Sequence, residues 1–226
     1  MSVIAIIQAR MGSKRFPGKS MYPFNGKPSL QHLLESVMQV IAKENIYLAS
    51  SINVENDAIE EFAVKNSFNV YRGDEENVAS RFLHILQQKP CDYFVRLNGD
   101  SPLMDYRVIE NALQHKNGGA DLISTVPGRK FPSGMNAEMI KSSTFLSSYE
   151  LFSTNDHFEH VTKYFYENDK KLHIVTLQCP ISNAQKFNFC FDTTEDRSKI
   201  EKIFAKLEKP HYEYTLQQKC SMLTTS

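Results

Sequence analysis

The sequence predicts a doubly wound α/β fold, built on a mostly parallel sheet with a small inserted excursion. Short β-rich apolar runs alternate with helical patterns along the first half of the chain, an order typical of parallel sheets covered by helices. Hydrophobic residues make up 41% of the 226 residues, which is enough to bury one sizeable core. We therefore expect residues 1–226 to form a single domain.

The alternating elements follow one another at short intervals. The expected elements are, in chain order, the strand Val3–Ala9, the helix Leu30–Ala42, the strand Ile46–Ser50, the helix Ala58–Lys65, the strand Phe68–Tyr71, the helix Val78–Gln87 and the strand Tyr93–Leu97. The first helix has the clearest pattern, because its apolar residues recur every three or four positions along one face. They are Leu30, Leu33, Leu34, Val37 and Ile41. Ser29 precedes them and is expected to cap the helix.

The regular alternation ends after one further unit. Val108–Leu113 has a helical pattern and Asp121–Thr125 an extended one, and Pro127–Gly134 follows as a turn-rich loop. We interpret residues 127–181 as an excursion that covers the site or pairs with a second subunit. Beyond it the sequence predicts a core strand, a helix and a tail without clear period, at Phe187–Phe191, Ile200–Leu207 and from Pro210 onward.

The charge balance argues for a small-molecule partner. Twenty-six basic residues balance twenty-six acidic ones, so no overall positive field favours nucleic acid or an anionic membrane surface. The apolar run Val3–Ile7 is too short for a signal-peptide core, and no stretch approaches the length of a membrane span. We therefore expect a cytoplasmic protein that binds neither nucleic acid nor membrane.

The cysteines indicate neither a zinc site nor a disulfide framework. Cys91, Cys179, Cys190 and Cys220 are scattered along the chain without a CxxC pair. We expect reduced thiols, with Cys190 in a core strand.

The first strand runs into a loop rich in basic residues. The loop reads Q-A-R-M-G-S-K-R-F-P-G-K and places four cations within ten residues, namely Arg10, Lys14, Arg15 and Lys19. In an open α/β sheet, ligands bind beyond the carboxyl ends of the strands, so this loop lies where a nucleotide triphosphate would be held. Gly12 lets backbone N–H groups approach phosphate, and the cations offset its negative charge. The charge of the loop does not by itself distinguish a phosphate-binding loop from a basic loop that is exposed to solvent.

Two common phosphate-binding motifs are excluded. Five residues separate Gly12 from Gly18 ahead of Lys19-Ser20, whereas a P-loop requires four. Pro23 and Pro28 follow almost at once and prevent the continuous helix that a P-loop opens. No G-x-G-x-x-G follows the first strand, so the dinucleotide-binding fingerprint is absent as well.

Two aspartates follow apolar runs that we expect to be strands. Asp100 lies just beyond Tyr93–Leu97, and Asp192 directly follows Phe187–Phe191. If both runs are strands of the sheet, both carboxylates emerge at the same edge. Magnesium takes one or two carboxylates together with substrate phosphate oxygens and water, so the pair predicts a magnesium site. Taken singly, each aspartate is better explained as a helix N-cap, and only their joint placement favours a metal site.

Five segments together resemble the SpsF-like cytidylyltransferases, a family related to the CMP-KDO and CMP-sialic acid synthetases. They are I-I-Q-A-R-M-G-S-K-R-F-P-G-K at 6–19, R-G-D-E-E-N-V-A-S-R-F at 72–82, R-L-N-G-D-S-P-L-M-D at 96–105, H-F-E-H-V-T-K-Y-F at 157–165 and F-D-T-T-E-D at 191–196. The resemblance implies a GT-A-type nucleotidyltransferase fold, CTP as donor, Mg²⁺ as cofactor and a homodimer. The implied reaction transfers CMP from CTP to a small anionic sugar or sugar-like acceptor and releases pyrophosphate, for surface polysaccharide or glycoconjugate synthesis.

The resemblance also assigns site residues. The nucleotide-binding residues would be Gln8, Ala9, Arg10, Gly12, Ser13, Arg15, Lys19, Arg72 and Asn98, and the metal ligands Asp100 and Asp192. We expect Lys19, Arg15 and Asp100 to act in catalysis, with the two cations stabilising the leaving pyrophosphate. The expected acceptor-binding residues are Asn136, Glu138 and His160. For Arg81, an exposed ion-pair face is at least as consistent with the sequence as substrate contact.

Two positions depart from the family pattern and leave alternatives open. Asn136 replaces an acidic residue of a common D-x-E, and Asn98 stands where sugar-acid synthetases often have glutamine. A GT-A glycosyltransferase is the nearest alternative, although Asn98-Gly99-Asp100 lacks the paired-acid D-x-D. A nucleotide-binding regulatory protein without catalysis is the other, since a shared fold does not guarantee a shared activity.

Overall fold

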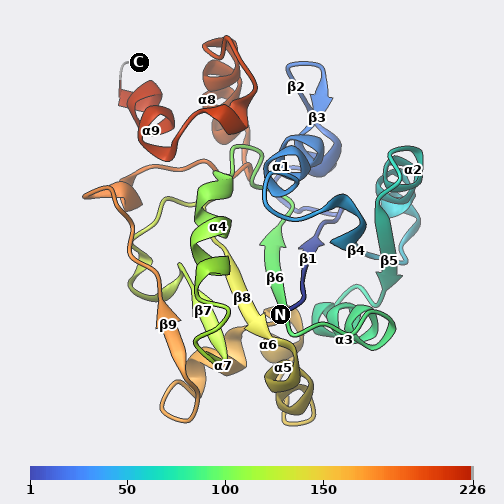
Figure 1. The fold of residues 1–226 in the computed structure, drawn as a ribbon. Coiled ribbons are helices and arrows are strands. Elements are labelled where there is room, and N and C mark those ends of the chain that lie inside the picture. Colours follow the sequence, from blue (N-terminus) through green and yellow to red (C-terminus); the bar gives the residue numbers. More distant parts are fainter. Residues whose placement is uncertain (225–226) are drawn as a thin grey trace.

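The computed structural model describes residues 1–224, which fold around one seven-stranded sheet flanked by helices (Figure 1). The strands lie in the order β5-β4-β1-β6-β8-β7-β9. Their bounds are β1 Val3–Gln8, β4 Ile46–Ser51, β5 Asn69–Gly73, β6 Tyr93–Asn98, β7 Leu122–Ser124, β8 Glu138–Lys141 and β9 Ile174–Thr176. A separate two-stranded hairpin is formed by β2 Pro23–Phe24 and β3 Lys27–Pro28.

The sheet is mostly parallel, as predicted. β1 pairs in parallel with both β4 and β6, and β4 pairs in parallel with β5. β8 is inserted antiparallel between β6 and β7, and β9 pairs in parallel with β7. The carboxyl ends of β1 and β6 therefore lie side by side at one edge of the sheet.

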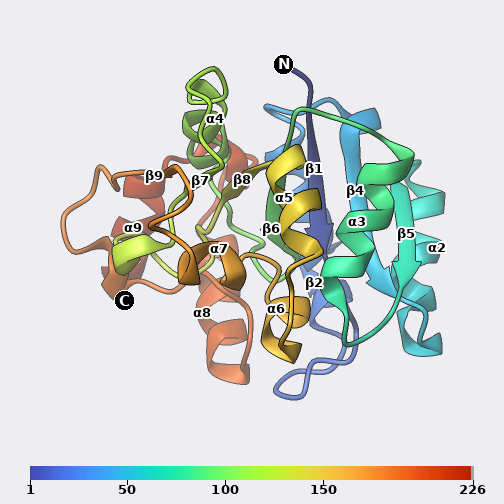
Figure 2. The same cartoon turned by 90° about the horizontal axis from the view of Figure 1, so that it is seen from below.

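The helices cover both faces of the sheet. Their bounds are α1 Ser29–Val37, α2 Asp57–Lys65, α3 Val78–Gln88, α4 Tyr106–Gln114, α5 Ser142–Tyr149, α6 Asn155–Glu159, α7 Lys163–Glu167, α8 Thr194–Ala205 and α9 Leu216–Thr224. Short 3₁₀ segments are η1 Lys19–Met21, η2 Lys43–Asn45, η3 Val54–Asn56, η4 Pro127–Arg129, η5 Ala184–Lys186 and η6 His211–Glu213. Figure 2 shows α3 and α5 lying over the sheet on one side. None of the helices within residues 1–224 is long and apolar enough to cross a membrane.

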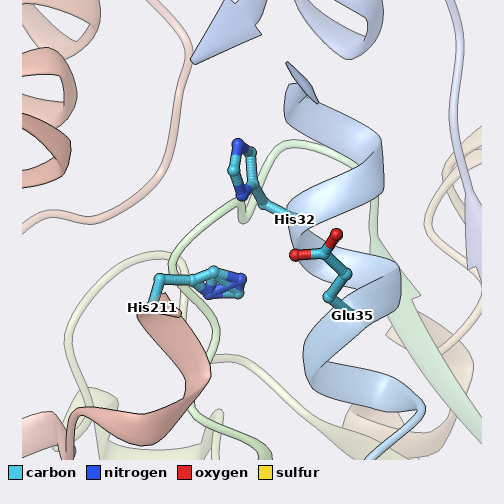
Figure 3. Close-up of side chains that lie close together, drawn as sticks. All are labelled: His32, Glu35 and His211. Atoms are coloured by element: carbon cyan, nitrogen blue, oxygen red, sulfur yellow. The ribbon is translucent and has the colours of Figure 1, made fainter. Parts of the chain in front are cut away.

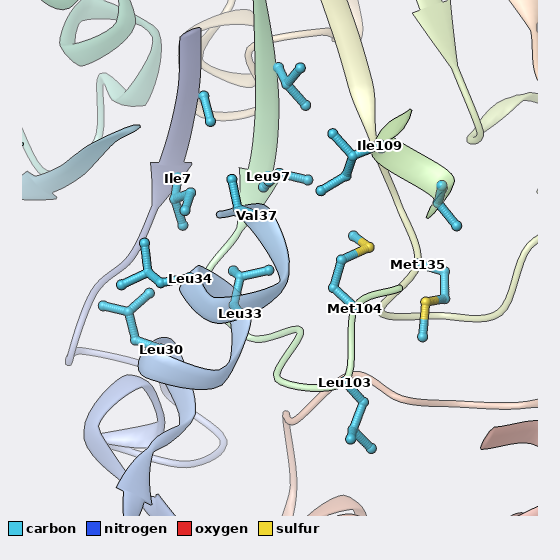
Figure 4. Packing of buried hydrophobic residues seen from close by; sticks show 14 of the residues in the cluster. Ile7, Leu30, Leu33, Leu34, Val37, Leu97, Leu103, Met104, Ile109 and Met135 are labelled. Carbon is cyan, nitrogen blue, oxygen red and sulfur yellow. The ribbon is translucent and has the colours of Figure 1, made fainter. Parts of the chain in front are cut away.

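Alternation along β1 builds the core on both faces, because successive side chains of a strand point in opposite directions. Ala5 and Ile7 join the cluster that includes α1, α2 and α4, whereas Ile4 and Ile6 join the cluster that includes α3, α5 and α7. Figure 4 shows the leucines of α1 packed near Ile7. Burial of one such side chain contributes about 1.5–3 kcal/mol, so the two layers fix the position of β1 and of the loop that follows it.

The predicted elements up to residue 125 are confirmed to within a residue or two, except at the first helix. α1 ends at Val37, and the N–H groups of Gln39 and Val40 then donate to carbonyls three residues back. Ser29 is not the cap, because Pro28 at the end of the small hairpin holds that position. The backbone N–H of Ser29 donates to the Tyr22 carbonyl at 2.8 Å, and its buried hydroxyl has no hydrogen-bond partner among the described residues.

The prediction of a core strand at Phe187–Phe191 is wrong in one respect. Phe189 and Phe191 are fully buried, but the only ladder contact found there in residues 1–224 is an isolated bridge between Ser133 and Asn188. The side chain of Asn188 accepts the Cys190 N–H at 2.9 Å, which removes a donor that a strand would use. Cys190 therefore lies half-buried in a segment outside the sheet.

The later segments also differ from expectation. Residues 127–181 contribute β8 and β9 to the sheet, so this excursion is part of the central layer as well as a cover over it. α9 forms in the tail where the sequence shows no clear period. Its Leu216 N–H donates to the Asp105 carboxylate at 2.6 Å. This tertiary hydrogen bond cannot be predicted from a local sequence pattern.

Candidate nucleotide-binding cleft

A cleft of about 430 Å³ opens at the carboxyl ends of β1 and β6. The predicted site residues that line it are Gln8, Ala9, Arg10, Ser13, Arg15, Lys19, Asn98, Asp100, His160 and Asp192. Five of them come from the loop after β1, and two follow or end β6. The structure therefore brings most of the predicted site together at the edge where ligands bind in open α/β sheets.

The basic loop has a defined conformation. The carbonyl of Met11 accepts N–H bonds from Ser13 at 2.9 Å and from Gly18 at 2.8 Å, which closes the loop on itself. Met11 N–H donates to Asn56 Oδ1 at 2.8 Å, which ties the loop to the segment after β4. The hydroxyl of Ser20 donates to the Arg10 carbonyl at 3.1 Å. These bonds fix the backbone from which the cations project into the cleft.

Lys19 lies between the two predicted metal ligands. Its Nζ is 2.8 Å from Asp100 Oδ2 and 2.5 Å from Asp192 Oδ1. Arg15 Nη2 contacts the other oxygen of Asp192 at 2.8 Å from the solvent side. The predicted proximity of the two aspartates is thus found, with an ammonium group between them.

Asp192 reaches this position without a strand. The Phe191 N–H donates to the carbonyl of Asp100 at 2.8 Å, which joins the two aspartate-bearing segments directly. Thr193 then caps α8 in a capping box with Asp196, whose Oδ2 also accepts the Asp192 N–H at 3.2 Å. Asp192 is therefore the residue before the N-cap, and its carboxylate stays free to face the cleft.

Lys19 and Asp192 keep their charges in this cluster. Burial alone would raise the pKa of Asp192, but the hydrogen bond and charge of Lys19, with the charge of Arg15, lower it. Burial alone would lower the pKa of Lys19, but the charges and hydrogen bonds of Asp100 and Asp192 raise it. Lys19 and Asp192 are therefore both ionised near neutral pH.

The donor set fits a magnesium ion. Oxygens of Asp100 and Asp192 and the sulfur of Cys190 lie within 4.8 Å of one another. Burial raises the pKa of the Cys190 thiol, and the nearby aspartates raise it further, so the sulfur stays protonated and is a poor ligand. Two hard carboxylates beside an open cleft are what magnesium takes from a protein when phosphate oxygens supply the rest.

Asn98 offers an unsatisfied acceptor at the floor of the cleft. Its side-chain Oδ1 is buried and has no hydrogen-bond partner among the described residues. Because buried polar atoms are nearly always paired, this oxygen is suited to accept a hydrogen bond from a bound ligand.

Arg72 and Arg81 do not lie where the sequence predicted them. Arg72 does not line the cleft; it is held by Asp57 and Glu60 and by backbone carbonyls after β4. Arg81 lines the cleft and is 1% exposed, so the exposed ion-pair interpretation is wrong. Its guanidinium is satisfied by the carbonyls of Asp74 and Glu75, both at 2.7 Å. A signal was present in the sequence, since position 81 falls on the apolar face of α3 together with Val78, Phe82 and Ile85.

Glu138 lies outside the cleft, in a buried network. Its side chain is 3% exposed and pairs with Arg96, while its other oxygen accepts the hydroxyl of Tyr166. Arg96 Nε donates in turn to Gln8 Oε1 at 3.1 Å. Glu138 therefore reaches the cleft only through Arg96 and Gln8.

The remaining predicted residues divide between the cleft and its surroundings. Asn136 is exposed and does not line the cleft, and Gly12 borders a neighbouring hollow with Arg10. His160 is exposed at the end of α6 and does line the cleft. His157 is buried, and its Nε2 lies 2.7 Å from Glu167 Oε2, so it has a packing role.

The comparisons with known proteins agree with this fold. The profile described as Cytidylyltransferase matches residues 4–221. The chain is 29% identical over 216 residues to the spore coat polysaccharide biosynthesis protein SpsF of Bacillus subtilis (strain 168), covering 92% of this chain and 89% of that protein. A solved cytidylyltransferase structure from Leptospira borgpetersenii serovar Hardjo-bovis has a TM-score of 0.93 at 26% identity, covering 100% of this chain and 94% of that one. A CMP:2-keto-3-deoxy-manno-octonic acid synthetase solved in complex with CTP shares the fold, with a TM-score of 0.67 at 18% identity over 91% of this chain and 99% of that one.

Proposed function

The chain belongs to the cytidylyltransferase family, as its five motifs predicted, and from that premise we propose that it transfers CMP from CTP to a small anionic sugar or sugar-like acceptor and releases pyrophosphate. The observation that carries the proposal is Lys19 between Asp100 and Asp192 on the floor of a cleft rich in cations. A polyphosphate needs cations for its oxygens and a place for its metal ion, and this cluster supplies both.

The residues around the cleft suit a cytidine triphosphate. Arg10, Lys14 and Arg15 line the cleft beside Lys19 and offset the negative charge of the triphosphate. The unpaired Oδ1 of Asn98 can accept a hydrogen bond from the amino group of cytosine, which is a donor. Uracil has a carbonyl oxygen where cytosine has this amino group, and that oxygen would face the Asn98 Oδ1 as a second acceptor, so this contact favours CTP over UTP.

The transfer step follows from these positions. An oxygen of the acceptor attacks the α-phosphorus of CTP in line, the new O–P bond forms, and the bond to the β-phosphate oxygen breaks. Lys19 and Arg15 neutralise the charge that develops on the departing pyrophosphate. Asp100 and Asp192 would hold Mg²⁺, and that ion, when bound, supplies further positive charge to the phosphate oxygens.

The proposed acceptor is an anionic sugar derivative destined for a surface polysaccharide or glycoconjugate. The name of the Bacillus relative points to polysaccharide synthesis, and the CTP-bound synthetase acts on a sugar acid. In this chain, the exposed His160 borders the cleft and can donate a hydrogen bond to a carboxylate or phosphate group. We propose His160 as an acceptor contact and Glu138 as the residue that positions Gln8 through Arg96.

Two further properties belong to the proposal. A homodimer formed through residues 127–181 is tested by light scattering of the purified chain, where a monomer at all concentrations would rule it out. A cytoplasmic location follows from the nucleotide substrate, because CTP is a cytoplasmic metabolite.

The experiment that tests the function is pyrophosphate release with each of the four NTPs, in Mg²⁺, against a panel of anionic sugars. We expect release with CTP and one acceptor class, and loss of at least about a hundredfold in kcat for Asp100→Asn and Asp192→Asn, which keep the side-chain size but lose the charge. Asp169→Asn is the matched control, because Asp169 is exposed and outside the cleft. CTP binding without turnover on any acceptor would refute the transferase and favour a regulatory nucleotide-binding role.

A further inference from the structure

A second cluster of ionisable side chains lies outside the nucleotide cleft. His32 and Glu35 are one turn apart on α1, and His211 is the first residue of η6. Ring nitrogens of the two histidines and a carboxylate oxygen of Glu35 all lie within 4.8 Å of one another. Figure 3 shows the three side chains converging on one space from two segments that are far apart in the sequence. They border a cavity of about 440 Å³, which gives a small ion access from solvent.

His211 is the least satisfied polar side chain of the cluster. The residue is 3% exposed, and neither ring nitrogen has a hydrogen-bond partner among the described residues. Burial lowers the pKa of His211 to about 2, so the ring is neutral and keeps a lone pair at physiological pH. A buried imidazole without partners is rare, and one that faces other ligand-type atoms is suited to a bound ion.

His32 is already arranged as a metal-binding histidine. Its Nε2 is 2.8 Å from the carbonyl oxygen of Phe24, and a carbonyl can only accept, so the ring proton is on Nε2. The lone pair is therefore on Nδ1. Metal-binding imidazoles commonly donate their second N–H to a backbone carbonyl in this way, which fixes the tautomer and the ring orientation.

Glu35 supplies the anionic member of the cluster. Lys27 Nζ contacts Glu35 Oε1 at 2.7 Å, and the Lys27 side chain is 53% exposed. This ammonium compensates the carboxylate from the solvent side, and its flexible stem lets it move away when another cation binds.

We propose that His32, Glu35 and His211 form a binding site for a divalent transition-metal ion of the zinc class. Two neutral imidazoles and one carboxylate are a known zinc ligand set, and three protein ligands leave a fourth position for water. Mg²⁺ prefers oxygen ligands, so this site is chemically distinct from the aspartate pair of the cleft. A bound ion would join α1 to the segment that leads into α9.

The test is a zinc titration of the full chain after removal of metals with a chelator, carried out in excess Mg²⁺ to occupy the aspartate pair. Calorimetry is expected to show one Zn²⁺ bound per chain. A Zn²⁺ concentration about a hundredfold above Kd is expected to raise Tm by about 5–10 °C. Co²⁺ added in place of Zn²⁺ is expected to give the absorption of a site with nitrogen ligands.

Single substitutions test which residues bind the ion. His211→Gln and Glu35→Gln are expected to weaken Zn²⁺ binding at least about tenfold, which would cut the rise in Tm at the same Zn²⁺ concentration to about half or less. His115→Gln removes an exposed histidine elsewhere and is expected to change neither. If His211→Gln does not fold, Glu35→Gln decides alone, because Glu35 is partly exposed. Unchanged Zn²⁺ binding in Glu35→Gln, no binding to the wild-type chain, or binding lost in Asp192→Asn instead would each overturn the proposal.

Discussion

Gly134 packs against the backbone segment that leads to Asp192. Its substitution by alanine therefore tests whether this packing holds Asp192 in the cleft. Gly134 has φ +84°, and a Cβ built on it would lie 2.6 Å from Phe189 C, 2.7 Å from Cys190 N and 2.8 Å from Phe189 O. All three are backbone atoms, so no side chain can rotate away to make room. The segment that would have to move carries Asp192, three residues beyond Phe189.

The expected cost has two parts. A non-glycine residue in the left-handed region costs about 1–2 kcal/mol, and crowding in a packed region costs a further 1–3 kcal/mol or so. Gly134→Ala is therefore expected to lose about 2–5 kcal/mol of unfolding free energy. Gly119→Ala is the matched control, because Gly119 has φ +70° with no atom within 4 Å of the added Cβ, so it pays only the first part.

Urea unfolding of the two variants measures the difference, and pyrophosphate release measures its effect on the site. We expect Gly134→Ala to be at least about 1 kcal/mol less stable than Gly119→Ala, and to lose about tenfold or more in kcat, since a shift of Asp192 of about 1 Å can cost a hundredfold. Equal stability of the two variants, or full activity in Gly134→Ala, would refute the reasoning.

Three further predictions concern single side chains. Lys19→Gln is expected to lower kcat by about 10²–10³ in steady-state pyrophosphate release, because a charged donor to the phosphates is lost; a loss below about threefold would exclude the role of Lys19. Glu138→Gln is expected to destabilise the fold by about 3–5 kcal/mol in urea unfolding, because Arg96 is left as a buried charge without its partner; unchanged stability would contradict the buried pairing. Burial lowers the pKa of Lys219 from 10.5 to about 8. Between these two pH values the unfolded chain binds more protons than the folded chain, so the free energy of unfolding rises with pH. At about 1.4 kcal/mol per pH unit, the whole rise is about 3 kcal/mol. Lys219→Met is expected to lack that rise, and parallel stability curves for the two proteins from pH 8 to 10.5 would show that Lys219 is not the cause.

The sequence by itself determined the parallel strands β1, β4, β5 and β6 of the sheet and the edge at which they present ligand sites. The periodicity of α1 and the apolar runs of β1, β4 and β6 are local patterns, and local patterns predict elements because burial of one face drives each element into place. The rule that parallel strands present ligand sites at their carboxyl ends then placed the basic loop and Asp100 together. The five motifs in order gave the family, which the comparisons confirm.

The tertiary structure alone decided which distant groups meet. Asp192 reaches Asp100 through one backbone bond from Phe191, although the predicted strand before it is not in the sheet. Arg81 turns into the cleft while Arg72 binds acids on α2, because the partners of each guanidinium come from other segments. His211 in η6 comes close to His32 in α1 only through the packing of the long stretch of chain that separates these two elements. Side-chain partners separated by long stretches of sequence have no period to reveal them, since their proximity is set by the packing of whole layers.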